Sequence, residues 1–221
     1  MAHSKLLSCE MTADIRKQFD KVFLQLQELG LLLLSDANLP SVSGIVTGEK
    51  LRGSWWAHKQ GQTIFAISEM LEDHTDVLIT KLISDKVTFV HRELWGRIYS
   101  IGTAREDWQL INLSPAAKLL LKTVEAEGSL ETNKLGRKFG AKPAETAREL
   151  ELRLLVHAEQ KHSESGAHTK VLETWDTWAQ RAGFRPRAQS AQASKSFLEQ
   201  RLAQINMNNG YGRLPWTNAL R

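Results

Sequence analysis

Positively charged side chains gather in the C-terminal half of the chain, where Lys134, Arg137, Lys138 and Lys142 fall in one short stretch. Such side chains can hold the phosphate groups of a nucleic acid, which fixes a protein on a duplex without reading its sequence. Further candidates follow downstream. The nucleic-acid contacts that we predict are Lys134, Arg137, Lys138, Lys142, Thr146, Arg148, Arg153, Lys161, His162, His168 and Lys170.

Acidic residues share this region. Glu145, Glu149 and Glu151 lie in the same predicted helix as Arg148, and their charge would oppose a phosphate backbone. The alternative interpretation is therefore a folded module that makes protein contacts or serves as a spacer.

A second candidate site lies in the N-terminal half, at residues 52–58 (Arg-Gly-Ser-Trp-Trp-Ala-His). Adjacent tryptophans beside basic residues can stack on an unpaired or flipped base. Alternatively, one tryptophan fills the core, the other covers it, and Arg52 forms an ion pair. The residues of this possible stacking site or pocket are Arg52, Trp55, Trp56, His58 and His91.

Histidines also occur together. His157, His162 and His168 lie on or beside one predicted hairpin, but no recognised metal-ligand spacing is present. We expect no metal and no cofactor, and hydrogen bonding or phosphate contact is the preferred role of these imidazoles. Helix caps and turns account for Asp73, Asp76 and Asp85.

The elements that would position the basic cluster follow the order of a winged helix. Ser114 and Pro115 begin a first helix, with Ala116, Leu119, Leu120 and Val124 on its buried face and Gly128 at its end. A second helix is predicted over residues 131–139, with Leu135 and Phe139 buried. Pro143 begins a third, in which Ala147, Leu150 and Leu154 are buried and Thr146, Glu149 and Arg153 point outward.

A hairpin follows these three helices. The chain alternates through His157, Glu159 and Lys161, turns at residues 163–166 and returns through 169–174, which predicts the wing.

The first 110 residues predict a smaller α+β domain. Residues 12–30 form an amphipathic helix that begins at Thr12 and ends at Gly30, and 62–71 form a second. Residues 35–53 favour a loop with a short strand at 45–47. Strands at 77–82 and 87–90 are joined by a turn at 84–85, and a helix follows at 93–101. This domain could itself be a degenerate winged helix.

Charge is unevenly distributed along the chain. Residues 1–110 carry 12 Lys+Arg and 14 Asp+Glu, residues 111–179 carry 10 of each, and residues 180–221 carry 7 against 1. The basic character therefore belongs to the tail, where 185–194 are expected to be disordered and 197–205 to form a short docking helix. We predict domains at 1–110 and 111–182, followed by a basic, partly disordered tail at 183–221. The tail either attracts phosphates or is simply solvated.

No apolar run approaches the roughly 18 residues that a membrane-spanning helix needs, and no signal peptide is expected. The single cysteine, Cys9, excludes an intramolecular disulfide and a Cys-rich zinc site. We expect a cytoplasmic, nucleoid-associated protein with no membrane partner.

Six strings of the sequence resemble an AlkZ-related family of AlkZ/YcaQ-type winged-helix proteins over roughly residues 35–180. These strings are residues 52–58, 76–82 with 86–91, 148–151, 154–157 and 163–168. The resemblance implies the field of DNA repair, because the larger group comprises winged-helix DNA glycosylases that release alkylated or crosslinked bases.

The sequence departs from those enzymes in one respect. They use a Gln-x-Gln or Gln-x-Asp motif, whereas Gln25-Leu26-Gln27 falls inside a predicted amphipathic helix and is interpreted as a coincidence. The leading hypothesis is an α+β, C-terminal winged-helix protein that binds duplex DNA in repair or genome maintenance. The alternatives are a glycosylase-like enzyme acting on damaged bases, and a protein-interaction module without nucleic-acid binding.

Overall fold

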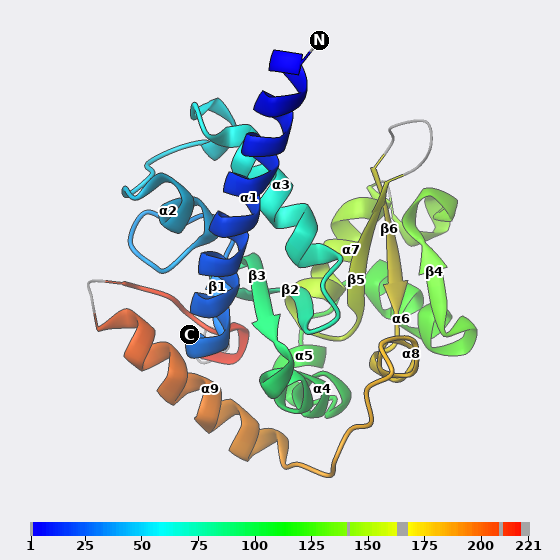
Figure 1. Ribbon diagram of the computed structural model, residues 1–221. Helices are drawn as coiled ribbons and strands as arrows, with labels where there is room; N and C mark the ends of the chain where they lie inside the picture. Colours follow the sequence, from blue (N-terminus) through cyan, green and yellow to red (C-terminus); the bar gives the residue numbers. More distant parts are fainter. Residues whose placement is uncertain (1, 141, 163–167, 208–209, 218–221) are drawn as a thin grey trace. The chain divides into compact units, whose positions relative to one another are not determined.

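The computed structural model describes residues 2–140, 142–162, 168–207 and 210–217, with only the backbone described for 2–12, 134, 161, 162 and 168. Helices and two three-stranded antiparallel sheets make up the fold, which confirms the predicted α+β class (Figure 1). The chain divides into two compact units. Unit 1 comprises Met1–Ile79, Lys86–Leu94 and Gln200–Gly212; unit 2 comprises Thr80–Asp85, Trp95–Glu199 and Arg213–Arg221. Among the described residues, no helix is both long and apolar enough to cross a membrane.

Unit 1 is built on a helix-covered sheet with the strand order β1-β3-β2. Its elements are α1 (Ala2–Leu29), β1 (Leu31–Leu33), α2 (Val42–Thr47), η1 (Trp55–Ala57), α3 (Gly61–Glu72), β2 (Val77–Ile83), β3 (Lys86–His91) and η2 (Arg92–Leu94). The helices α1, α2 and α3 pack on one another. Their apolar faces meet the sheet in a core that includes Val22, Leu26, Ile64, Ile67 and Phe89. This apolar stripe is the reason that α1 and α3 fold as amphipathic helices.

In unit 1, the sequence correctly predicted one helix end, a hairpin turn and two further helices. Gly30 ends α1 with φ +74°, a left-handed conformation that glycine adopts without steric cost. The predicted hairpin and its turn at Ser84 and Asp85 are confirmed, and both turn residues have positive φ. The helices predicted at 62–71 and 93–101 are also confirmed, with the second beginning as η2.

Two predictions for unit 1 were wrong. The first helix begins at Ala2, ten residues before the expected cap at Thr12. The expected strand at 45–47 lies in α2, because the Ser41 hydroxyl accepts a hydrogen bond from the Gly44 N–H and caps a helix there. Pro, Ser and Gly in this stretch therefore mark helix ends as well as loops.

Unit 2 contains short helices followed by the second sheet. Its elements are α4 (Trp95–Thr103), α5 (Asp107–Leu110), α6 (Pro115–Glu127), β4 (Ser129–Glu131), η3 (Thr132–Lys134), η4 (Arg137–Phe139), α7 (Pro143–Leu152), β5 (His157–His162), β6 (His168–Glu173), α8 (Trp175–Arg181) and η5 (Pro215–Thr217). The cap at Ser114 is confirmed, since its hydroxyl accepts from the Ala117 N–H, and Gly128 ends α6. The buried face of α6 is shifted from the predicted one, because Ala117 and Leu121 are buried and Leu119 is exposed.

The second predicted helix is not a continuous α-helix. Residues 129–131 form β4, and the chain then makes two separate 3-10 turns, η3 and η4. Gly136 between them has an extended backbone, and Phe139 is buried as predicted. Of the residues predicted to form that helix, only Glu131 lies in β4; the others form the two 3-10 turns and the extended segment between them.

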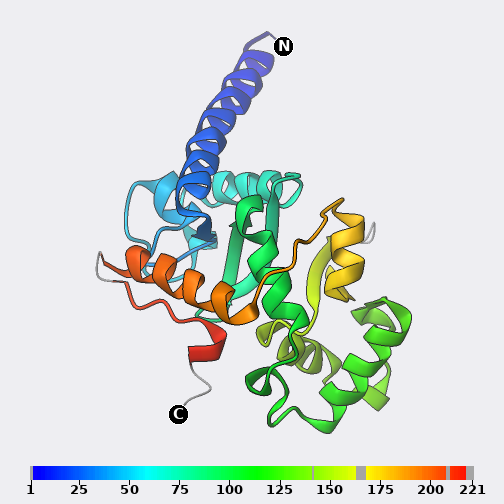
Figure 2. The ribbon, with the colours of Figure 1, turned by 90° about the horizontal axis from the view of Figure 1, so that it is seen from below.

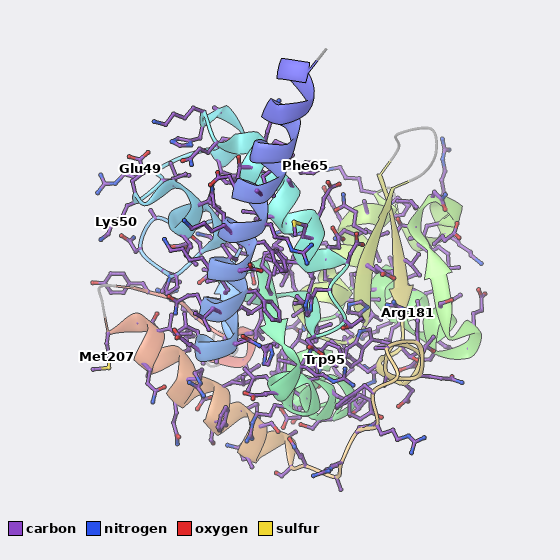
Figure 3. The ribbon with its side chains drawn as sticks, in the orientation of Figure 1. Glu49, Lys50, Phe65, Trp95, Arg181 and Met207 are labelled. Carbon is purple, nitrogen blue, oxygen red and sulfur yellow. The ribbon has the colours of Figure 1, made fainter. Side chains whose placement is uncertain are left out.

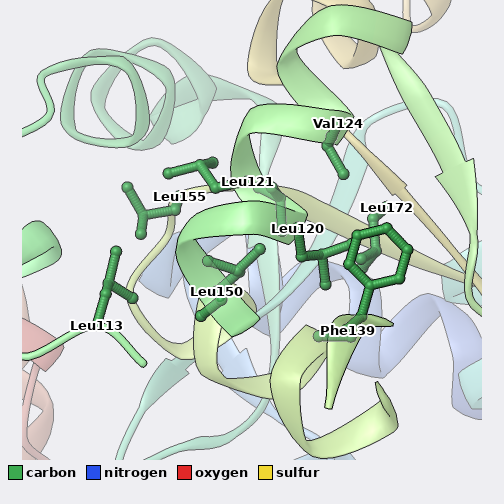
Figure 4. Packing of buried hydrophobic residues seen from close by; sticks show 11 residues of the cluster. Leu113, Leu120, Leu121, Val124, Phe139, Leu150, Leu155 and Leu172 are labelled. Atoms are coloured by element: carbon green, nitrogen blue, oxygen red, sulfur yellow. The ribbon is translucent and has the colours of Figure 1, made fainter. Parts of the chain in front are cut away.

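The three strands of unit 2 lie in the order β4-β6-β5, and both pairings are antiparallel. The predicted hairpin is confirmed as β5 and β6, with His157 opposite Glu173; its turn at 163–166 lies outside the described residues. Figure 4 shows the core that α6, α7 and this sheet share, including Leu120, Leu150 and Leu172. Packing of α6 against α7 is visible from another direction in Figure 2.

The tail contains a longer helix than expected. Helix α9 (Ala191–Asn206), drawn in orange in Figure 2, takes in residues 191–194, which the sequence indicated as disordered. Leu198, Leu202 and Ile205 are buried, as a docking helix requires. The basic tail is therefore partly a folded element.

Candidate functional site

Three basic side chains of unit 2 are exposed and available. Arg137 and Lys138 lie in η4, and Arg148 lies on α7. Within the described part of the chain, Arg137 and Arg148 make no side-chain hydrogen bond or ion pair, and the Lys138 ammonium lies 4.8 Å from the ring centre of Phe139. These three cations can approach an anionic partner without first breaking an internal bond.

The polar side chains that were expected to point outward from α7 instead hold unit 2 together. Thr146 is 8% exposed, and its hydroxyl donates to the Phe139 carbonyl at 2.8 Å. Glu149 accepts from both the N–H and the hydroxyl of Ser114, at 2.9 and 2.7 Å, and so ties α7 to the start of α6. The outward orientation predicted for Thr146 was therefore wrong.

Arg153 has a similar internal role. Its Nη1 atom donates to the carbonyl oxygens of Trp108, Gln109 and Ile111, the last at 2.6 Å. Those carbonyls belong to α5 and its end, which leaves them without partners inside the helix. The predicted outward position of Arg153 was wrong, because the guanidinium caps a helix.

Two lysines share one buried carboxylate. Glu151 lies 3.2 Å from the Nζ atom of Lys81, in the part of β2 that belongs to unit 2, and 2.8 Å from that of Lys170 on β6. Burial lowers the pKa of Lys81, as do the nearby charges of Lys170 and Arg148, while Glu151 opposes the shift. Lys170, a predicted phosphate contact, is thus occupied by an internal ion pair.

The remaining predicted contacts divide into two groups. Lys142 is exposed and forms a 2.8 Å ion pair with Glu145, a surface pair of the kind that contributes little stability. For Lys134, Lys161, His162 and His168, the side chains lie outside the described residues. The described side chains contain no group of three or more His, Cys, Asp or Glu residues placed to hold a metal ion.

His157 lies at the base of the hairpin β5–β6, opposite Glu173. Its Nδ1 atom lies 2.8 Å from Glu173, which also accepts from Arg181 at 2.6 Å, and both His157 and Glu173 are buried. Burial by itself raises the pKa of the Glu173 carboxyl, but its bonds to His157 and Arg181 outweigh this effect and lower the pKa overall. The arrangement fixes the ends of β5 and β6 against α8.

The tryptophan segment in unit 1 forms an exposed aromatic stack. The Trp55 and Trp56 rings are 4.0 Å apart with an interplanar angle of 24°, and Trp56 lies 5.3 Å from Phe65 on α3. Trp55 packs against the core, whereas Trp56 is 61% exposed. Arg52 is also exposed, so a stack supported by the core stands beside a solvent-facing cation.

His58 and His91 have different surroundings. The Nε2 atom of His58 lies 3.0 Å from Glu49, at the base of the tryptophan turn. His91 is buried beside Phe23, 4.0 Å from Glu93, and in the part of the chain that the structure describes its Nδ1 atom has no hydrogen-bond partner. The contacts therefore join His58 to the tryptophan segment, and join His91 to α1 and η2.

Several residues of these networks were not recognised in the sequence. The acidic residues have partners between 8 and 70 residues away in the chain: Ser114 for Glu149, Lys81 and Lys170 for Glu151, and His157 and Arg181 for Glu173. No local pattern in the sequence indicates these partners, because they lie in distant segments of the chain. Comparison with known families adds a further observation, because the AlkZ-related family matches residues 16–214.

The chain belongs to the AlkZ-related family. This match extends beyond the stretch at 35–180 on which the sequence resemblance rested, and it takes in the C-terminal half of α1 and the whole of α9. No match was found among the curated proteins or the solved structures.

The glutamine strings of this AlkZ-related protein lie on its N-terminal helices. Gln25-Leu26-Gln27 is inside α1, where Leu26 is fully buried, as the amphipathic pattern predicted. Two further strings of the same spacing were missed, Gln18-Phe19-Asp20 in α1 and Gln60-Gly61-Gln62 at the start of α3. The Gln18 Oε1 atom is buried and has no hydrogen-bond partner among the described residues.

Proposed function

We propose that this AlkZ-related protein binds duplex DNA in repair or genome maintenance, and that residues 111–182 act as a winged helix. The observation that carries the proposal is the element order α6, β4, the two 3-10 turns, α7, β5 and β6, with the strands in the order β4-β6-β5. In helix-turn-helix proteins, a helix of this kind enters a groove while its flanks contact phosphates. Membership of the AlkZ-related family supports the same field.

The proposed contact surface consists of Arg137, Lys138 and Arg148, with the hairpin β5–β6 as the wing. Thr146 and Arg153 are left out of this surface because their polar groups are used internally. Of the acidic residues that would have opposed DNA, Glu151 is paired with Lys81 and Lys170, which offset its charge, whereas Glu149 accepts only from the neutral groups of Ser114. Repulsion from α7 is therefore smaller than its sequence suggests.

The test is duplex binding by Arg137→Glu/Lys138→Glu, measured by fluorescence anisotropy across a range of salt concentrations. Each lost phosphate contact lowers the slope of log K against log salt by about 0.9, so the double variant is expected to lose about two units of slope and most of its affinity. The matched control is Lys118→Glu/Lys122→Glu on α6, which makes the same charge change at exposed positions. Equal losses in both variants, or no loss in the first, would refute the proposed surface.

A further inference from the structure

The tryptophan turn at residues 55–57 of unit 1 exposes an aromatic ring that is held in place from below. Trp56 is one of the few large apolar side chains that remain exposed, and it lies between well-packed elements. Burying a large apolar side chain stabilises a protein by roughly 1.5–3 kcal/mol. The exposure of Trp56 gives up this stabilisation, so packing of the core does not explain it. A rigid ring facing solvent is suited to receive another flat group.

Hydrogen bonds fix the turn that carries the ring. The Ala57 N–H donates to Ser54, that of His58 to Trp55, and that of Gly61 to His58. The His58 ring adds two contacts, since its Nδ1 atom accepts from the Gln60 N–H and its Nε2 atom lies 3.0 Å from Glu49. The aromatic stack is therefore formed before any ligand arrives, which lowers the entropy lost on binding.

Gly61 makes this close packing possible. A Cβ atom at position 61 would lie 3.0 Å from the Trp56 carbonyl oxygen and 3.2 Å from that of Trp55. The first residue of α3 can therefore approach the tryptophan turn only because it has no side chain.

The charges around the turn are mostly positive. Lys50, Arg52 and Lys59 are exposed, while the nearby carboxylate of Glu49 is paired with His58. Figure 3 labels Glu49 and Lys50 on the loop that leads into the turn, and Phe65 on α3. Since one residue spans at most about 3.6 Å, the Arg52 and Lys59 backbones lie within about 15 Å of the Trp56 backbone. That is the scale of one or two nucleotides.

We infer that the Trp55–Trp56 stack is a binding site for an unpaired nucleobase, with Arg52 and its neighbouring lysines holding the adjoining phosphates. The ligand class is single-stranded nucleic acid, or a duplex in which one base is unstacked. This combination of aromatic rings and cations is the general means of binding single strands without sequence preference. The inference rests on the proposed function and adds a second contact, separate from the duplex-binding surface of unit 2.

The test compares Trp56→Ala and wild type for binding to a single-stranded oligothymidylate of about 16 nucleotides and to a duplex of equal length. Since a base–aromatic stack contributes about 1–3 kcal/mol, the variant is expected to bind the single strand about five- to hundredfold more weakly. Duplex affinity should change less than about twofold. Trp56→Phe should retain most of the single-strand affinity, because a flat ring remains.

The matched control is Tyr211→Ala, which removes an aromatic side chain that is 84% exposed in the same unit. It should leave single-strand binding unchanged. If wild type does not bind the single strand, or if Trp56→Ala and wild type bind it equally, the inference is overturned. Selective binding of an oligoproline peptide through Trp56 would overturn it as well.

The two proposals fail in different ways. Loss of duplex binding in Arg137→Glu/Lys138→Glu, together with an unaffected single-strand affinity in Trp56→Ala, would retain the duplex surface and remove the stacking site. A Trp56 effect on the single strand without any Arg137 and Lys138 effect on the duplex would do the reverse. Circular dichroism of each variant confirms that it is folded.

Discussion

Glu173 connects three elements through one buried carboxylate. It accepts from Arg181 on α8 and pairs with His157 on β5, while its own backbone belongs to β6. Removing a charged group from water is costly unless partners replace the lost hydration. Its partners therefore determine whether this residue stabilises the base of the hairpin β5–β6.

We expect Glu173→Gln to lower the free energy of unfolding by about 2 kcal/mol at pH 7. Losing one partner of a fully buried pair costs about 3–5 kcal/mol, and the partial exposure of Arg181 reduces that figure. Urea unfolding measures the change. The control is Glu159→Gln, which removes a more exposed partner of the same arginine and should cost less than about 1 kcal/mol.

The effect of Glu173 depends on pH. Its pKa in the folded protein is lower than the ordinary value of 4.5, so its stabilisation is present above about pH 4.5 and is lost as the pH falls through the folded pKa. The stability difference between wild type and Glu173→Gln should therefore shrink on acidification below that value. A difference that stays constant from pH 7 to pH 3 would contradict this assignment.

The phenol of Tyr99 can be titrated on its own once the other tyrosine is removed. Its hydroxyl donates to Asp176, and this bond is the main reason that the pKa of Tyr99 is raised to about 12. Tyr99 and Tyr211 are the two tyrosines of the chain. In Tyr211→Phe, the phenolate absorbance should therefore rise with a midpoint near pH 12.

Adding Asp176→Asn to that variant provides the control. Removing the carboxylate should bring the midpoint back toward the ordinary value of 10. The Tyr99–Asp176 bond stabilises the fold below about pH 10, and this contribution is lost as the pH rises toward 12. An unchanged midpoint in the double variant would exclude Asp176 as the cause.

At the scale of elements, local signals predicted the fold better than apolar spacing did. Ser114 with Pro115, and the glycines at positions 30 and 128, mark helix ends through their own backbone and capping chemistry, and all were placed correctly. Two features were predicted wrongly: which residues of α6 face the core, and whether Thr146 of α7 faces the core or the solvent. Both depend on the elements that pack against these helices. No short stretch of sequence contains that information.

In the candidate site too, features that depend on residues close in sequence were predictable, and features that depend on distant segments were not. The basic cluster was visible because its members are close in sequence, and Arg137, Lys138 and Arg148 are exposed. Arg153 and Lys170 resemble equally good contacts in the sequence, but each has an internal partner from a distant segment. Conversely, the tryptophan stack was predictable as a candidate, whereas its support by Gly61 was not.

Packing of α4 against α8 offers a test at this scale. A Cβ atom on Gly102 of α4 would overlap the indole Nε1 atom of Trp175, which donates to the Leu154 carbonyl at 2.7 Å. Gly102→Ala should therefore cost about 3 kcal/mol, the upper end of the usual cost of overpacking, and lower the melting temperature by about 6–12 °C.

The control for this substitution is Gly136→Ala. Its backbone has φ −81°, and no atom lies within 4 Å of the added carbon. The melting temperature should change by less than about 2 °C. Similar melting temperatures for the two variants would indicate that the helices can separate without loss of stability.

At the scale of the whole molecule, each unit has a hydrophobic core of its own, and neither unit is one continuous stretch of chain. Residues 80–85 belong to unit 2 although they lie inside the hairpin β2–β3, and 200–212 belong to unit 1. Sequence reasoning divides a chain at points along its length, so it could not predict units made from interleaved segments.

The tail is expected to stabilise the fold, in addition to any attraction that its charge exerts. In unit 2, Ser194 bonds to Ser100 at 2.8 Å, Lys195 pairs with Glu106 at 2.8 Å, and Leu198 is fully buried. Leu198→Ala should lower the free energy of unfolding by about 2–5 kcal/mol, because a buried cavity forms. The exposed neighbour Gln200 supplies the control, since Gln200→Ala should change it by less than about 0.5 kcal/mol. If both variants unfold at the same urea concentration as wild type, α9 contributes no core, and the tail acts through its charge alone.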